Sequence, residues 1–354
     1  MDIKKIDKNM IDGEKNDASV KWYNNYRKDF QVHGLYWFDQ NHSFCRLREQ
    51  ANISDNVNQL AYHPSGAFLS FMTDSPSISL RVSLSSAAYM SHMSACGQCG
   101  LDLYFWDGKD FVFLATTKIN KAEYEITMID HLPKKMRYYR LYLPTYTKLI
   151  DIAVGINSHA QLKKWGNFYP EAIVCYGTSI TQGGCVTRPG MSYPSILGRN
   201  IEYEIYNLGF SGSAKLEQSI AQEIATIKEM KYLIIEAEAN CEQGNLLEKR
   251  LPVFIDTINQ ANKKVKTYVI SHYPRPDSLI KDEVKKLMKL NATIQKNICK
   301  KYQNVEFIDG KKLLKKFAYE ETVDGVHLTD LGFYEVAKFF SKKLKKRTIS
   351  LFYK

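Results

Sequence analysis

Hydrophobic and polar residues follow one pattern before about residue 170 and another after it. In the first part, short segments alternate apolar and polar residues, most strictly in Ser77–Ser85. A period of two is typical of half-buried strands, and Asp107-Gly108 between two such segments predicts a hairpin turn. The other segments of this kind are residues 68–73, 101–106, 111–115 and 137–144. Short strands separated by turns predict an antiparallel, jelly-roll-like β-sandwich over residues 21–160.

The second part alternates short apolar runs with longer segments of helical character. The apolar runs are residues 172–177, 204–209, 232–237, 267–271 and 305–309. The helical segments are residues 192–200, 214–230, 245–263, 278–302 and 330–346. Strands that are apolar throughout and separated by helices are typical of a parallel sheet covered on both faces. Residues 161–354 are therefore predicted to form a second domain, of the α/β class.

Composition narrows the class of protein but not its activity. The 354 residues are 44% hydrophobic, which suits two folded domains and excludes a disordered, collagen-like or coiled-coil chain. There are 49 basic and 38 acidic side chains, a formal charge of +11. The excess is mostly lysine, without an arginine-rich stripe between aromatic residues, so we interpret it as a solvated surface and expect no nucleic-acid partner.

The chain begins with a polar, aperiodic segment, and residues 1–20 are predicted to be a polar tail. This segment lacks the apolar stretch of a secretory signal, and no apolar run approaches the roughly 18 residues of a membrane span. The seven cysteines are scattered, which favours free thiols in a reducing compartment. We therefore expect a cytoplasmic protein without stable membrane insertion, and the sequence leaves a homo-oligomer open.

Residues capable of chemistry follow the ends of the predicted parallel strands. Ser179 follows the first strand, and Asp324 and His327 follow the last. The carboxyl ends of parallel strands meet at one edge of a sheet, where sites of α/β proteins lie. An aspartate three residues before a histidine can hold one imidazole nitrogen while the other takes a proton from a serine. Gly209 and Asn240, after the second and third strands, could donate N–H groups to an oxyanion.

The order Ser, Gly, Asn, Asp-x-x-His resembles the SGNH, or GDSL-type, hydrolase superfamily over about residues 170–345. The matching blocks are Gly177–Thr181, Asn207–Gly209, Asn240 and Asp324–His327. The resemblance implies a flavodoxin-like, three-layer α/β domain with Ser179 as nucleophile, His327 as general base and Asp324 as its partner. It also implies an oxyanion hole made by the N–H groups of Ser179 and Gly209 and the side chain of Asn240.

A second resemblance covers the predicted sandwich. Gly100–Tyr104 is similar to the Gly-x-Asp-Leu-Tyr signature of a β-sandwich domain that precedes some SGNH hydrolases. Two departures from the family pattern stand out: Thr178 replaces a common aspartate, and Glu236–Cys241 replaces a common Gly-x-Asn-Asp. Either Glu236 or Glu238 supplies the missing carboxylate, or this region is rebuilt.

Other candidates surround these residues. We expect Thr178, Gln182, Gly183 and His272 to bind substrate, and by its position His272 also competes with His327 as the base. Cys96 and Cys99 have the spacing of a metal or redox pair, but one pair falls short of the four ligands of a structural zinc site. We therefore expect two free thiols in a loop, no metal and no organic cofactor. The segment that begins at His92 is expected to lean over the pocket.

Together these features predict a serine esterase that hydrolyses carboxylic esters through an acyl-enzyme. The family resemblance favours O-deacetylation of a carbohydrate or small metabolite. Two alternatives stay open. One is a non-catalytic glycan-binding protein with a relic hydrolase domain, and the other is a lipid-active acyl hydrolase drawn to anionic surfaces by its positive charge.

Overall fold

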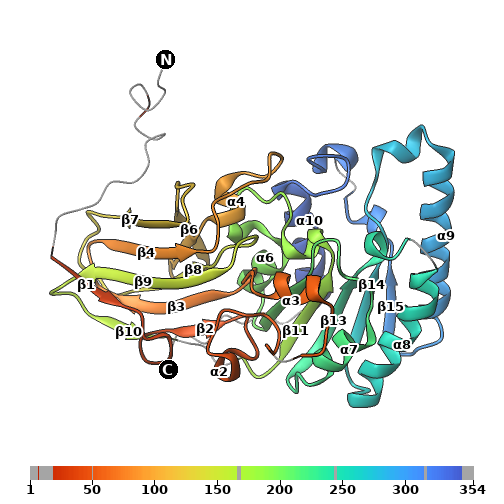
Figure 1. The fold of residues 1–354 in the computed structure, drawn as a ribbon, viewed down its shortest axis with the longest axis horizontal. Helices are drawn as coiled ribbons and strands as arrows, with labels where there is room; N and C mark the ends of the chain where they lie inside the picture. The colour runs from red at the N-terminus through yellow and green to blue at the C-terminus, as the bar shows by residue number, and fades with distance from the viewer. Residues whose placement is uncertain are drawn as a thin grey trace.

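The computed structural model describes residues 7, 19–49, 51–165, 169–242, 245–314 and 317–344. The predicted polar tail, residues 1–20, falls almost entirely outside the described residues, and so does the end of the predicted last helix. Within the described part of the chain, none of the helices combines the length and apolar character that a membrane crossing requires. A β-rich region is followed along the chain by an α/β region, which is the fold class that the sequence predicts, and the two lie side by side (Figure 1).

The N-terminal region is a sandwich of two antiparallel sheets around an apolar core. One sheet has the order β1 (Val20–Tyr23), β9 (Leu149–Asn157), β4 (Ile78–Leu84) and β7 (Glu123–Ile129). The other has the order β10 (Leu162–Lys164), β3 (Phe68–Thr73), β8 (Arg137–Tyr142), β5 (Asp102–Trp106) and β6 (Phe111–Thr116), with β2 (Gln31–His33) also beside β3. The predicted sandwich is thus confirmed, with further strands that the alternation did not single out, above all β7 and β9.

The described part of this region also contains four short helices: α1 (Tyr26–Asp29), α2 (Phe38–Asn41), α3 (Asp55–Ala61) and α4 (Ala95–Cys99). Cys96 and Cys99 lie in α4 and not in the expected loop, and both are free thiols. Trp37, Val57 and Ala61 are buried in the core of the α/β region and not in that of the sandwich. The two regions therefore share a hydrophobic core.

The α/β region is built on a parallel sheet. Its order is β12 (Glu204–Gly209), β11 (Ala172–Gly177), β13 (Met230–Glu236), β14 (Lys266–Ile270) and β15 (Val305–Ile308). Numbered along this region, the order is 2-1-3-4-5, which is the flavodoxin-like order. The predicted fold class is confirmed. Because β11 lies between β12 and β13, the loops after these three strands open at one edge of the sheet.

Helices cover both faces of this sheet (Figure 1). On one face lie α7 (Gln218–Ala225), α8 (Leu246–Ala261) and α9 (Asp282–Cys299), and on the other lie α6 (Tyr193–Asn200) and α10 (Asp330–Lys343). Val174 and Tyr176 of β11 pack toward the first face, whereas Ile173 and Cys175 pack toward the second. Both faces of the strand are buried, which explains its continuous apolar run.

Short helical turns complete the loops. They are α5 (Ser179–Gln182), η3 (Pro189–Met191), η4 (Glu238–Asn240), η5 (Pro276–Leu279), η6 (Gly310–Lys312) and η7 (Ala318–Glu321). Two of them, α5 and η4, directly follow β11 and β13 and carry candidate site residues.

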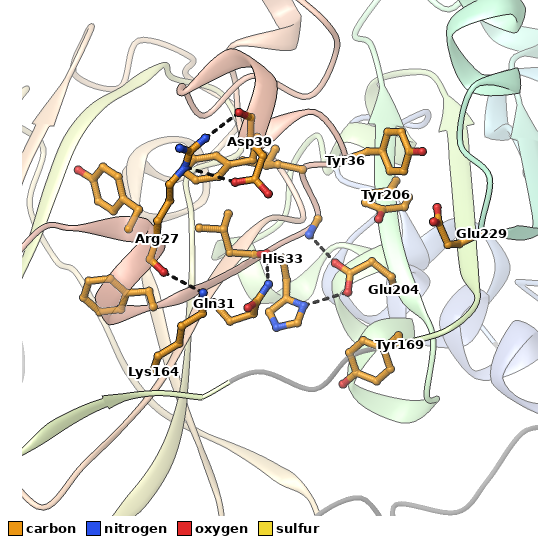
Figure 2. A pocket seen from close by; sticks show the side chains of 16 residues that line it. Arg27, Gln31, His33, Tyr36, Asp39, Lys164, Tyr169, Glu204, Tyr206 and Glu229 are labelled. Carbon is orange, nitrogen blue, oxygen red and sulfur yellow. Dashed lines mark hydrogen bonds and ion pairs between the residues drawn. The ribbon is translucent and has the colours of Figure 1, made fainter.

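A cavity of about 780 Å³ lies between the sandwich side and the edge strand β12 (Figure 2). Its wall includes Arg27, Glu204 and His33, and His33 Nδ1 lies 2.9 Å from a Glu204 carboxylate oxygen. Figure 2 shows His33 and Glu204 turned toward each other, whereas Arg27 turns toward Asp39. Ser179, Asp324 and His327 are not among the residues that line it, so this cavity is not the predicted site.

Candidate active site

Ser179, His327 and Asp324 form a continuous hydrogen-bonded relay. Ser179 is the first residue of α5, and its Oγ lies 2.8 Å from Nε2 of His327. Nδ1 of the same imidazole lies 2.7 Å from Oδ2 of Asp324. All three side chains are partly exposed, so a reactant can reach them. The structure therefore brings together the three residues that the sequence predicts, although they lie as much as 148 positions apart.

Hydrogen bonds within the loop that carries Asp324 and His327 fix the position of both side chains. Oδ1 of Asp324 accepts the backbone N–H groups of Val326 and His327 at 3.0 and 2.8 Å. Partial burial raises the pKa of Asp324, but hydrogen bonds from His327 and these N–H groups outweigh it and leave the pKa below its usual value. The carboxylate is therefore ionised at neutral pH and can stabilise a protonated imidazole.

Gly209 cannot donate to an oxyanion, contrary to the expectation from its motif. Its N–H already donates to Oδ1 of Asn207 at 2.9 Å, and the residue is buried at the end of β12. A Cβ at this position would lie 2.1 Å from the backbone nitrogen of Gln182. Gly209 is thus a glycine because β12 packs closely against α5.

Gly212, three residues later, is the better donor, and the sequence analysis missed it. It is exposed, has φ +65°, and no hydrogen bond from its N–H is found among the described residues. The loop is pinned on both sides, because Ser211 N–H donates to Oε1 of Gln182 at 2.9 Å and Ala214 N–H donates to Oδ1 of Asn240 at 3.1 Å. The second glycine of the Gly-Phe-Ser-Gly run was the signal that could have identified it.

Asn240 is presented by the turn η4 with its amide in a defined orientation. Because Oδ1 accepts the N–H of Ala214, the Nδ2 group is directed away from that contact, and no acceptor for it is found in the described part of the chain. As the first residue of α5, Ser179 also has a backbone N–H without an acceptor inside its helix. Three N–H donors from the loops after β11, β12 and β13 are therefore available at this edge.

Glu236 supplies a carboxylate beneath the nucleophile. One of its oxygens accepts the hydroxyls of Thr178 and Thr181 at 2.8 and 3.0 Å and the N–H of Thr178 at 3.2 Å. Burial raises the pKa of Glu236 to about 7, although these hydrogen bonds lower it. The sequence leaves open whether Glu236 or Glu238 supplies the missing carboxylate. In the structure it is Glu236 that contacts Thr178, the residue that replaces an aspartate common in the family.

Thr178, Gln182 and Gly183 lie behind the site and are buried, so the expectation that they bind substrate needs correction. Thr178 caps α5, its oxygen accepting the N–H of Ile180. Gln182 links three segments, with bonds to Ser211 N–H, the Thr145 carbonyl at 3.0 Å and the His63 ring. Gly183, with φ +107°, ends α5. These residues fix the turn that carries Ser179.

His272 also lies apart from the relay. Its ring Nδ1 lies 2.7 Å from Oε1 of Glu238, and its backbone N–H donates to Oε2 of the same carboxylate at 3.0 Å. Gln295 donates to that same oxygen. The His272 and Glu238 side chains are only 7% and 2% exposed, and Ser179 Oγ bonds to His327 instead. His272 thus anchors the start of η4, the turn that presents Asn240.

The sandwich signature contacts the α/β region, in the segment that follows the turn carrying Ser179. Asp102, in Gly100–Tyr104, is fully buried and accepts the N–H of Gly190 at 2.8 Å and the Arg188 guanidinium at 2.9 Å. Tyr104 accepts a further bond from Arg188. The neighbouring segment also leans toward the site as expected, because the rings of His92 and His327 lie 6.0 Å apart.

Comparisons with known proteins agree with this arrangement. The profile of the GDSL-like lipase/acylhydrolase family matches residues 170–345, and that of the N-terminus of SGNH-hydrolase-type esterases matches residues 20–162. No sequence match is found among proteins of curated function.

Solved structures share the whole two-part fold. A protein described as a GDSL-like lipase from Bacteroides ovatus is 26% identical, with a TM-score of 0.82 over 93% of this chain and 99% of that one. A salicylyl-acyltransferase from a tetracycline biosynthetic pathway is 18% identical, with a TM-score of 0.71 over 92% of this chain and 96% of that one. An acetyl xylan esterase from the rumen bacterium Butyrivibrio proteoclasticus is 10% identical, with a TM-score of 0.56 over 92% and 98%. The last two likenesses establish a common fold.

Proposed function

The chain belongs to the GDSL-like lipase/acylhydrolase family, with the N-terminal module of SGNH-type esterases, and we propose that it is a serine esterase acting on O-acetyl groups of a carbohydrate or small metabolite. The relay Ser179–His327–Asp324, with bonds of 2.8 and 2.7 Å, carries the proposal. An intact relay also argues against the alternative of a glycan-binding protein with a relic hydrolase domain.

The geometry suits nucleophilic acyl transfer. His327 takes the proton of Ser179 as Oγ attacks the ester carbonyl, and Asp324 stabilises the imidazolium that forms. The carbonyl oxygen, now negative, is held by the N–H groups of Ser179 and Gly212 and by Nδ2 of Asn240. His327 then protonates the leaving alcohol, and a water molecule, activated by the same imidazole, releases the acid.

The choice of an acetylated carbohydrate rests on analogy. The acetyl xylan esterase of similar fold acts on such an ester, and the sandwich next to the site could contact the alcohol portion of a larger substrate. The lipid-active alternative has one supporting observation: apolar side chains near His327, including Val323, Val326 and Leu331, are 38–45% exposed.

Hydrolysis of p-nitrophenyl acetate by the full chain and by Ser179→Ala tests the proposal. We expect turnover by the natural sequence and a loss of several orders of magnitude in the variant. A variant that keeps more than about a tenth of the rate would contradict Ser179 as nucleophile. Acetylated sugars and p-nitrophenyl esters of increasing chain length then separate the alternatives, because a lipid-active enzyme prefers long chains and a relic domain hydrolyses none.

A further inference from the structure

A second cluster of reactive side chains overlaps the relay. It comprises His92, Cys185, Asp324 and His327, and one nitrogen, sulfur or oxygen atom of each lies within 4.8 Å of those of the others. The four residues come from three separate parts of the fold: the sandwich segment before α4, the turn after α5, and the loop before α10. His92 and Cys185 take no part in the proposed proton relay, so their convergence on it calls for a separate explanation.

The chemistry of the cluster selects a particular class of cation. Two imidazoles, a thiol and a carboxylate are the donors that Zn²⁺ binds, whereas Mg²⁺ and Ca²⁺ favour oxygen ligands alone. Zinc ligands at about 2.0–2.3 Å in a tetrahedron lie roughly 3.5 Å from one another. The 4.8 Å limit exceeds this spacing by about 1 Å, so the most distant donors must approach one another, and His92, which is exposed, is the member best able to move.

Cys185 is held where its sulfur faces the other three residues. It is 7% exposed, and its backbone N–H contacts Sδ of Met93 at 3.4 Å, next to His92. Its φ of +72° is a left-handed conformation that a residue with a Cβ adopts at a cost. The thiol is consequently positioned by the turn after α5, and the exposed His92 side leaves a route for an ion to enter.

We propose that His92, Cys185, Asp324 and His327 form an inhibitory Zn²⁺ site. The proposal rests on the proposed esterase function only for the inhibition. Zn²⁺ loses bound water molecules as it bonds to Cys185 Sγ, whose proton passes to solvent, and to the nitrogen and oxygen donors. When Asp324 binds the ion, His327 Nδ1 loses its hydrogen-bond acceptor. When the His327 ring binds the ion, Ser179 loses its general base. Hydrolysis therefore stops while the ion is bound.

The first measurement is metal binding to the full chain, which does not depend on activity. Co²⁺ serves as the probe, because a thiolate ligand gives a charge-transfer absorption band in the near ultraviolet, and Zn²⁺ should displace it. We expect the band in the natural sequence and in Ser179→Ala, and its loss in Cys185→Ser. Cys96→Ser, which removes a partly buried thiol outside the cluster, is the matched control and should keep the band.

The second measurement is inhibition of p-nitrophenyl acetate hydrolysis by ZnCl₂ and its reversal by a chelator. We expect His92→Ala and Cys185→Ser to keep basal rates within about twofold while needing at least about tenfold more Zn²⁺ for half-inhibition. Equal Zn²⁺ sensitivity of these variants and the natural sequence, or no metal binding at all, would overturn the site. If no variant hydrolyses esters but the Co²⁺ band still depends on Cys185, the metal site stands and the proposed function and its inhibition fall.

Discussion

Individual residues of the relay have unequal tasks, so their removal should cost unequal amounts. His327→Ala removes the group that moves the proton, whereas Asp324→Asn keeps the imidazole and an oxygen for the N–H groups of Val326 and His327. We expect Asp324→Asn to retain roughly ten to a hundred times the kcat of His327→Ala on p-nitrophenyl acetate. His272→Ala is the comparison: if it is inactive while His327→Ala is near normal, the base has been misassigned.

Glu236 should make stability depend on pH. Its pKa is raised from 4.5 to about 7 in the folded chain, so between these values the folded state binds more protons than the unfolded state. The stabilisation from protonated Glu236 is complete below about pH 4.5 and is lost as the pH rises through about 7. We expect the free energy of unfolding to fall by roughly 3 kcal/mol from this group across that window.

Glu236→Gln tests this dependence, because the amide does not titrate. Urea unfolding of both proteins across the window should show the natural sequence losing stability relative to the variant as the pH rises. Glu335→Gln, at a partly exposed glutamate paired with Lys338, controls for the loss of one carboxylate. Parallel curves for natural sequence and Glu236→Gln would show that burial does not raise the pKa of this group.

Elements of the fold were predictable to the extent that they are local. The parallel strands are buried on both faces, so their apolar runs stand out, and β11, β12 and β15 lie where the sequence predicts them. Strand β7 alternates polar and apolar residues like the others and could have been singled out, whereas β9 is buried over most of its length and does not alternate.

The site residues were likewise predictable only where their signal is local. Ser179, Asp324 and His327 lie in local motifs, whereas the contact of His272 with Glu238 joins positions 34 apart and has no local signal. The glycine motif likewise showed that a turn follows β12, but not that Gly209 packs against α5 while Gly212 exposes its N–H.

The turn η4 supports a prediction of its own. Glu238 binds the N–H and Nδ1 of His272, which fixes the start of the turn that ends at Asn240. Glu238→Gln places an amide where both oxygens accept hydrogen bonds, so we expect Asn240 to lose its position. Because an oxyanion donor acts in the transition state, kcat should fall by about tenfold with little change in KM.

A double-mutant cycle distinguishes this positioning role from a general loss of stability. Combined with Asn240→Ala, Glu238→Gln should add little further loss of kcat, since its effect passes through Asn240. Glu242→Gln, four residues later and paired with Arg275, is the matched control and should keep kcat. Losses from Glu238→Gln and Asn240→Ala that multiply in the double variant would contradict the positioning role.

At the scale of the whole molecule, residues of the sandwich side form hydrogen bonds with the turn that carries Ser179 and with the end of β12. Tyr146 and Thr145 reach the Ser179–Gln182 turn, and Arg46 reaches the end of β12. These contacts and the shared hydrophobic core around Val57 join the two regions that carry the two sequence signatures. The sequence predicted two adjacent domains, and the structure adds that the nucleophile's turn is bonded to both.

Arg46 provides the sharpest test of this coupling. Its guanidinium is 1% exposed and donates to the carbonyls of Asn207 and Gly209 at 2.9 and 2.7 Å and to that of Leu60 at 2.8 Å. Burial lowers its pKa to about 10, so it remains charged at neutral pH. Arg46→Met keeps much of the volume but removes the guanidinium donor from the buried carbonyls of Asn207 and Gly209, whereas the Leu60 carbonyl keeps the N–H of His63 at 3.1 Å. We expect a loss of about 3 kcal/mol or more in unfolding free energy.

The kcat of Arg46→Met should fall together with its stability, because Gly209 directly precedes the loop that carries Gly212. Arg48→Met is the matched control: Arg48 is two residues away, its side chain is 48% exposed, and its ion pair with Glu223 should contribute about 1 kcal/mol or less. Urea unfolding and kcat on p-nitrophenyl acetate, measured where each variant is fully folded, separate the two effects. A folded Arg46→Met with normal kcat would show that the sandwich side stabilises the catalytic edge without shaping it, since the loop would then keep its geometry without the guanidinium.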